Sequence, residues 1–139
     1  IFPYSVKYNS AFCGPFREAA KSTPNFGDRK TYQMNFKNSE EAINEVKLDI
    51  NEGADVIIIK PAISYLDIIY RIKQKFNVPI IAYNVSGEYT MVKSASENNF
   101  INDIETIFEI LHSIKRSGAN AIISYHALEV AKYLKSNDL

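Results

Sequence analysis

Gly53-Ala54-Asp55-Val56-Ile57-Ile58-Ile59-Lys60-Pro61 is the most informative run in the chain, because a short turn leads into a continuous apolar segment that ends in a lysine. A second run, Gly118-Ala119-Asn120-Ala121-Ile122-Ile123-Ser124-Tyr125, repeats this pattern. Both runs follow helical patterns, and glycine suits the left-handed position just after a helix. A continuous apolar segment predicts a strand buried on both faces, which is typical of parallel sheets.

The rest of the chain extends this alternation of helices and strands. We expect strands near 2–7, 56–60, 80–84 and 121–125, and helices from about 38 and 88 and over about 64–76, 104–114 and 128–135. This alternation predicts a parallel α/β fold, either doubly wound or a barrel. Polar residues follow the strands, namely Lys7, Lys60, Tyr83-Asn84 and Ser124-Tyr125. Because a barrel gathers the carboxyl ends of all its strands around one site, these residues favour a barrel.

The composition excludes several classes of function. The 139 residues suffice for about one domain. The 16 Lys and Arg balance the 16 Asp and Glu without a block of like charge, which argues against nucleic-acid or anionic-membrane binding. No apolar run is long enough for a membrane span, and no glycine-rich phosphate loop is present. Cys13 is the only cysteine, which excludes an internal disulfide and a cysteine-rich zinc site and favours a reducing compartment.

Lys60 and Lys7 are the strongest candidates for catalytic residues. Each follows an apolar strand, where desolvation and a second nearby cation lower the pKa of an ammonium group. A neutral amine can attack a ketone and form a Schiff base. The alternative is that each lysine only extends its charged end past the rim of the sheet into water.

The connection over residues 9–38 is long and has little periodicity, a pattern typical of active-site lids. It carries Arg17 and Arg29, whose planar guanidinium groups suit a substrate carboxylate, although ordinary surface charge is the alternative. Ser86-Gly87 after the third strand offers a hydroxyl and a close backbone approach, or else only a turn that enters a helix.

Other ionisable residues carry weaker signals. We expect His112 to face solvent and His126 to cap or pack a helix rather than to catalyse. Cys13 has no adjacent histidine to activate it as a nucleophile. The glutamates near 40–45 most simply form the solvated face of a helix.

Seven strings, in order over nearly the whole chain, match one known family. They are Tyr4-Ser5-Val6-Lys7-Tyr8, Phe12-Cys13-Gly14-Pro15-Phe16-Arg17-Glu18-Ala19-Ala20, Gly27-Asp28-Arg29-Lys30-Thr31-Tyr32-Gln33-Met34, Val56-Ile57-Ile58-Ile59-Lys60-Pro61-Ala62, Tyr65-Leu66-Asp67-Ile68, Tyr83-Asn84-Val85-Ser86-Gly87-Glu88-Tyr89 and Ser113-Ile114-Lys115-Arg116-Ser117-Gly118-Ala119. These strings resemble the porphobilinogen synthase family, also called delta-aminolevulinic acid dehydratase.

The resemblance implies a (β/α)8 TIM barrel, of which residues 1–139 form the C-terminal portion of the one catalytic domain, about four βα units. It implies a hydro-lyase that condenses two 5-aminolevulinate molecules into porphobilinogen through lysine Schiff bases, in heme and tetrapyrrole synthesis. It also implies a homo-octamer in the cytoplasm or a plastid. The abrupt, strand-like start at Ile1 agrees with a piece of a longer protein.

The family's first substrate site and its second lysine map onto five positions. Lys60 matches the lysine that holds the first substrate as a Schiff base, and Tyr83 matches the aromatic residue beside it. Ser86 and Tyr125 match the hydroxyls that bind the carboxylate of this substrate. Lys7 matches the second lysine, which engages the other substrate.

The family's second substrate site and its metal sites are matched in part. Arg17, Arg29 and Gln33 match lid residues that grip the carboxylate of the second substrate. Glu45 matches a ligand of an allosteric magnesium, whereas the ligands of an active-site zinc or magnesium would lie in the N-terminal part, which this sequence lacks. One departure is Cys13, where the family commonly has an aromatic residue.

Two other readings stay open at the level of the sequence. Another Schiff-base TIM-barrel lyase, such as an aldolase, would need one lysine and no arginine-rich lid. Alternatively, the chain is a non-catalytic fragment of the synthase, because half a barrel leaves open sheet edges and much apolar surface.

Overall fold

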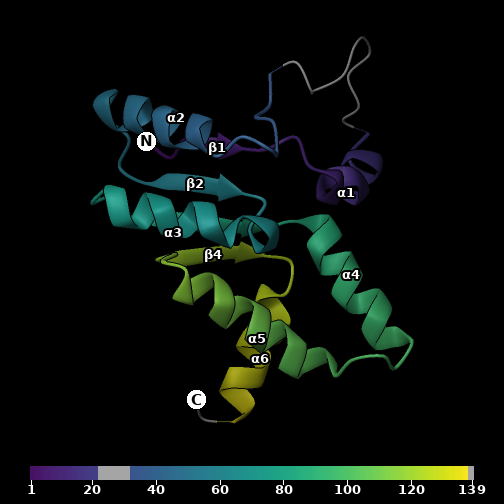
Figure 1. Ribbon diagram of the computed structural model, residues 1–139. Helices are drawn as coiled ribbons and strands as arrows, with labels where there is room; N and C mark the ends of the chain where they lie inside the picture. The colour runs from purple at the N-terminus through teal and green to yellow at the C-terminus, as the bar shows by residue number, and fades with distance from the viewer. Residues whose placement is uncertain (22–31, 138–139) are drawn as a thin grey trace.

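One parallel sheet organises the chain in the computed structural model, which describes residues 1–21 and 32–137 (Figure 1). Its strands are β1 (Val6–Lys7), β2 (Ile57–Lys60), β3 (Ile80–Asn84) and β4 (Ala121–Ser124). They lie in the sheet in chain order, and each neighbouring pair is parallel. The four predicted strands are thereby confirmed, although the first is shorter than expected. A doubly wound sheet would reverse its strand order at a switch point, whereas this order continues in one direction, as in a barrel.

Helices connect the strands. They are α2 (Glu40–Asn51) before β2, η3 (Ile63–Tyr65) and α3 (Leu66–Lys75) before β3, α4 (Ser86–Glu97) and α5 (Asp103–Arg116) before β4, and α6 (Ala127–Ser136) after it. Gly53 and Gly118 follow α2 and α5 with φ of +94° and +121°. Because side chains disfavour this left-handed region, the repeated Gly-Ala-Asx motif ends both helices as predicted.

Two predicted boundaries were wrong. The segment 9–38 is not simply a loop, because it contains η1 (Ala11–Cys13) and α1 (Gly14–Ala19). These elements are too short to show a helical period in the sequence, and they form where the segment packs against α4. Helix α4 also begins at Ser86 rather than at Glu88.

The hydrophobic core lies between the sheet and the helices α2, α3 and α5. It includes Val6, Val46, Ile57, Ile59, Ile69, Ile72, Ile80, Ala82 and Ile114, all of them fully buried. The opposite face of the sheet is less covered. Ile123 of β4 is 40% exposed, so the prediction that this strand is buried on both faces was wrong for the chain as it stands. The cause is its place at the edge of the sheet, where the described residues supply no further strand.

Among the described residues, no helix combines the length and the apolar character that crossing a lipid bilayer would require.

Candidate active site

Lys7 and Lys60 lie side by side at the carboxyl edge of the sheet. The register of β1 and β2 pairs Val6 with Ile59 and Lys7 with Lys60. Adjacent strands run about 4.8 Å apart, and successive side chains alternate between the two faces. Since Val6 and Ile59 point into the helix-covered core, both lysines point to the opposite face. The register thus brings two amines together that are 53 residues apart in the chain.

Three aromatic rings surround the Nζ atom of Lys60. The centroids of Tyr83, Tyr4 and Phe16 lie 4.6, 5.4 and 5.9 Å from it. A cation at such distances is attracted to each ring face by about 0.5–2 kcal/mol. A small pocket of about 10 Å³ lies there. Its lining consists of Cys13, Phe16, Lys60, Tyr83, Val85, Ser86 and Tyr125. The pocket therefore favours a positive charge at the end of the Lys60 side chain.

Tyrosines continue the aromatic lining beyond Lys60. The rings of Tyr83 and Tyr125 have their centroids 6.4 Å apart, and those of Tyr125 and Tyr89 are 5.7 Å apart. Burial, together with a hydrogen bond with Tyr125, raises the pKa of Tyr83 to about 12. Tyr83 therefore remains a neutral phenol at physiological pH.

The segment η1–α1 closes one side of the pocket. The Ser86 hydroxyl accepts the N–H of Phe16 at 3.0 Å, which ties α1 to the start of α4. At Gly87, an added Cβ would lie 2.3 Å from the carbonyl oxygen of Phe12. Gly87 thus allows a close backbone approach, and both Ser86 and Gly87 form the predicted helix entry at the start of α4. A binding role of the Ser86 hydroxyl stays a prediction. Cys13 is buried in this contact.

Gln33 is the described lid residue that reaches a lysine. Lys7 Nζ donates to Gln33 Oε1 at 3.4 Å and also to the carbonyl oxygen of Tyr8. Arg17 belongs to α1, but its side chain is outside the described part of the structure. Arg29 lies within 22–31 and is likewise outside the described residues.

Glu45, the candidate magnesium ligand, lies on the exposed face of α2 and apart from the lysines. Within residues 1–21 and 32–137, no group of three or more His, Cys, Asp or Glu side chains is arranged to hold a metal ion. A magnesium ion prefers several oxygen ligands, so the described residues of one chain do not complete a site around Glu45.

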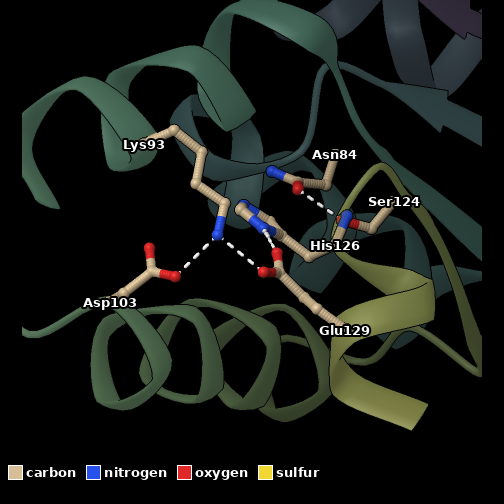
Figure 2. Close-up of polar contacts among 6 residues, drawn as sticks. All are labelled: Asn84, Lys93, Asp103, Ser124, His126 and Glu129. Atoms are coloured by element: carbon tan, nitrogen blue, oxygen red, sulfur yellow. Dashed lines mark hydrogen bonds and ion pairs between the residues drawn. The ribbon is translucent and has the colours of Figure 1, made fainter. Parts of the chain in front are cut away.

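A polar cluster that joins α4, α5 and α6 was not predicted from the sequence (Figure 2). Lys93 of α4 donates to Asp103 of α5 and Glu129 of α6, in both cases at 2.6 Å. The other oxygen of Glu129 lies 2.5 Å from Nδ1 of His126, which is 1% exposed and forms the N-cap of α6. The expected cap or packing role of His126 is thus confirmed. The three-residue spacing of His126 and Glu129 was the signal available in the sequence.

Lys93→Met should lower the melting temperature by about 4 °C near neutral pH, because ion pairs with partly exposed partners contribute on the order of 1 kcal/mol. The hydrogen bond from Lys93 holds the pKa of Asp103 below its ordinary 3.8. A carboxyl group whose pKa is lower in the folded state stabilises the fold at any pH above its unfolded-state pKa. This stabilisation is lost as the pH falls through the folded-state pKa. The difference in melting temperature between the parent and Lys93→Met should therefore be largest above about pH 5 and should decrease below about pH 4.

Thermal unfolding followed by circular dichroism between pH 3 and pH 7 would measure this difference. Lys132→Met on the exposed face of α6 is the matched control, for which we expect no comparable loss. An equal effect of the two substitutions at every pH would contradict the assigned ion pairs.

Comparisons with known proteins relate this geometry to one family. A family model described as delta-aminolevulinic acid dehydratase matches residues 1–133. Delta-aminolevulinic acid dehydratase from Bacillus subtilis is 56% identical over 134 residues, which are 96% of this chain and 41% of the relative. The protein of the same name from Staphylococcus aureus is 52% identical over 134 residues, with the same coverage of both chains.

A solved structure agrees with these relatives. Delta-aminolevulinic acid dehydratase from Toxoplasma gondii, in complex with the reaction product porphobilinogen, superposes with a TM-score of 0.91 and 47% identity. The match covers 94% of this chain and 37% of that one. The four-stranded parallel sheet with its helices therefore corresponds to part of a TIM barrel. The chain spans about 41% of the length of the curated relatives that it matches.

Proposed function

Because the chain belongs to the delta-aminolevulinic acid dehydratase family, we propose that it forms the lysine-bearing part of a porphobilinogen synthase. Residues 1–139 would be the C-terminal portion of one TIM-barrel domain, and the rest of the barrel would complete the site. The observation that carries this proposal is the in-register pairing of Lys7 with Lys60, beside an aromatic pocket. The activity is that of a hydro-lyase that joins two 5-aminolevulinate molecules.

Lys60 is the proposed site of the first Schiff base. Its neutral Nζ adds to the keto carbon of 5-aminolevulinate, the carbonyl oxygen leaves as water with the two amine protons, and the imine nitrogen then takes up one proton from solvent. The protonated imine carries a positive charge close to the three surrounding rings, whereas the ketone and the free amine are neutral. The rings favour this protonated imine over a neutral Lys60, as they also favour its ammonium form, so the neutral amine that attacks depends on the neighbouring Lys7.

Lys7 is proposed to engage the second substrate molecule. Two ammonium groups on adjacent strands repel each other, and the loss of one proton relieves this repulsion. The pairing thus supports one neutral lysine beside one charged lysine. An aldolase-type reaction needs only one such amine, so the pairing favours the synthase over that alternative.

The carboxylate groups of the two substrates need separate partners. We assign the first to the hydroxyls of Ser86 and Tyr125, with Tyr83 lining the space between, because all three line the Lys60 pocket. The second is assigned to Arg17, Arg29 and Gln33, of which Gln33 already contacts Lys7.

The remaining parts of the proposal concern the assembled enzyme. A magnesium ion at Glu45 would need further ligands from outside this chain, and an active-site zinc or magnesium would be held by the N-terminal part of the barrel. Homo-octamer assembly and a cytoplasmic or plastid location follow only from the family resemblance. The exposed edge strand β4 favours a chain that acts together with the rest of its barrel rather than alone.

Trapping with borohydride tests the proposed function. The assembled protein that carries this sequence is incubated with isotopically labelled 5-aminolevulinate and then reduced, and the modified lysine is located by peptide mass spectrometry. We expect a substrate-dependent label on Lys60 and formation of porphobilinogen. The absence of any label in a folded, assembled sample would refute the synthase and support an inert fragment.

A further inference from the structure

Glu88 is a buried carboxylate with four hydrogen-bond donors around it. It is 0% exposed, although it lies in the first turn of α4. Its Oε1 accepts the backbone N–H groups of Ala62 at 3.2 Å and Ile63 at 2.7 Å. Its Oε2 accepts the N–H of Val85 at 2.8 Å and the side-chain amide of Asn84 at 3.0 Å. A helix cap needs only the bond to Val85, so three of the four bonds serve another purpose.

The hydrogen bonds continue across the sheet from Asn84. Asn84 Oδ1 accepts the hydroxyl of Ser124 at 2.8 Å, and Ser124 Oγ accepts the backbone N–H of His126 at 3.1 Å (Figure 2). Glu88, Asn84 and Ser124, which we call the strand-end chain, thus link the carboxyl ends of β2, β3 and β4. Asn84 and Ser124 are also partners in the register of β3 and β4.

Each end of the strand-end chain lies next to a residue of the Lys60 pocket. Ala62 and Ile63 follow Lys60 by two and three residues, so Glu88 holds the turn that begins at this lysine. Asn84 directly follows Tyr83, and its side chain leaves the strand on the other face. Ser124 and His126 flank Tyr125. The strand-end chain therefore fixes the backbone at Lys60, Tyr83 and Tyr125, although none of its own residues lines the pocket.

We propose that Glu88, Asn84 and Ser124 are positioning residues, which set the relative places of Lys60, Tyr83 and Tyr125 through the strand-end chain. This inference rests on the proposed function, because it assigns these residues to the first substrate site. The effect is transmitted by the backbone, since none of the three lines the pocket. A displacement of about 1 Å at a reacting group costs about 100-fold in rate, so a rigid connection of this kind controls turnover.

Moving the carboxylate from position 88 to position 84 of the strand-end chain gives a specific test. Asn84→Asp replaces the amide that donates to Glu88 with a second carboxylate, so two buried like charges face each other. We expect kcat/KM to fall about 100-fold. Adding Glu88→Gln supplies a side-chain amide that can donate to the new carboxylate at position 84. The amide oxygen still accepts the backbone N–H groups of Ala62 and Ile63, whereas the bond from the Val85 N–H is lost. The double variant should recover about 10-fold of the lost kcat/KM.

Ser124→Ala removes the other link with little change in volume. The bond at Asn84 Oδ1 and the acceptor for the His126 N–H disappear, while Tyr125 remains. Because the hydroxyl of Tyr125 is assigned to the carboxylate of the first substrate, we expect KM for this substrate to rise about 10-fold with a smaller change in kcat. Asn98→Asp and Glu97→Gln, at the exposed far end of α4, are matched controls and should leave both constants unchanged.

Amide hydrogen exchange separates the failure of this inference from failure of the proposed function. Exchange at Ala62 and Ile63 should become faster in Asn84→Asp and return toward the parent rate in the double variant. If the parent forms no Schiff base, the proposed function fails, and amide exchange still decides whether the strand-end chain holds this turn. The positioning role is overturned by a different result. In that result, borohydride labels Lys60 of the parent, but the double variant has the same kcat/KM and the same amide exchange rates at Ala62 and Ile63 as Asn84→Asp.

Discussion

Lys60→Met is expected to lower porphobilinogen formation by at least about 10,000-fold in the assembled enzyme, because loss of the proposed covalent nucleophile removes the reaction path itself. Methionine has a similar length and no amine, so it can still fill the space between the Tyr83, Tyr4 and Phe16 rings. The fold should therefore persist, and borohydride should no longer label this position.

Lys7→Met should also be strongly impaired, because it removes the amine assigned to the second substrate, but labelling at Lys60 should survive. Lys47→Met, on the exposed face of α2, is the control and should retain parent turnover. Steady-state assays, with circular dichroism to verify folding, would measure these effects. Full turnover in the double variant of Lys7 and Lys60 would refute the assigned chemistry.

Gly87→Ala is expected to reduce kcat/KM by about 100-fold or more, through displacement of the η1–α1 segment. The new Cβ would lie 2.3 Å from the carbonyl oxygen and 2.6 Å from the Cα of Phe12. Both atoms belong to the backbone, so no side-chain rotation relieves the clash. The segment must move away, which weakens the bond from the Phe16 N–H to Ser86 and removes one ring from Lys60.

Thiol labelling reports this displacement independently of catalysis. Cys13 is 6% exposed in the closed arrangement, so the rate of its modification, followed by peptide mass spectrometry, should rise in Gly87→Ala. Gly14→Ala is the matched control, because nothing lies within 4 Å of its added Cβ and its φ of −57° suits alanine. Unchanged kcat/KM and Cys13 labelling in Gly87→Ala would show that this close contact does not close the pocket.

Local patterns predicted the framework of the molecule well. The apolar runs before Lys60 and Tyr125 became β2 and β4, and Gly53 and Gly118 ended the preceding helices. These features depend on near neighbours in the chain, so a sequence pattern suffices to find them. The short elements η1 and α1 were missed because their helical form depends on contacts with α4, about 75 residues away.

The residues of the candidate site and their gathering at the strand ends were predicted, but the strand register and the packing around them were not. The two lysines were recognised from their positions after apolar strands, and the pocket residues from the family resemblance. Glu88 escaped notice because Val85, the N-cap, has no side-chain oxygen to mark a capping box, and a glutamate near a helix start usually faces solvent. Its burial follows from donors on the turn after β2, which no local pattern contains.

The sequence by itself determined the strands, the helices and the amines that follow two of the strands, because hydrophobic periodicity and turn chemistry act over a few residues. Only the tertiary structure decided that Lys7 lies beside Lys60 in the strand register, that three rings surround Lys60, and that the strand-end chain joins three strands. Strand register and burial are set by packing between distant segments, and a slip of one residue would turn these side chains to the other face of the sheet.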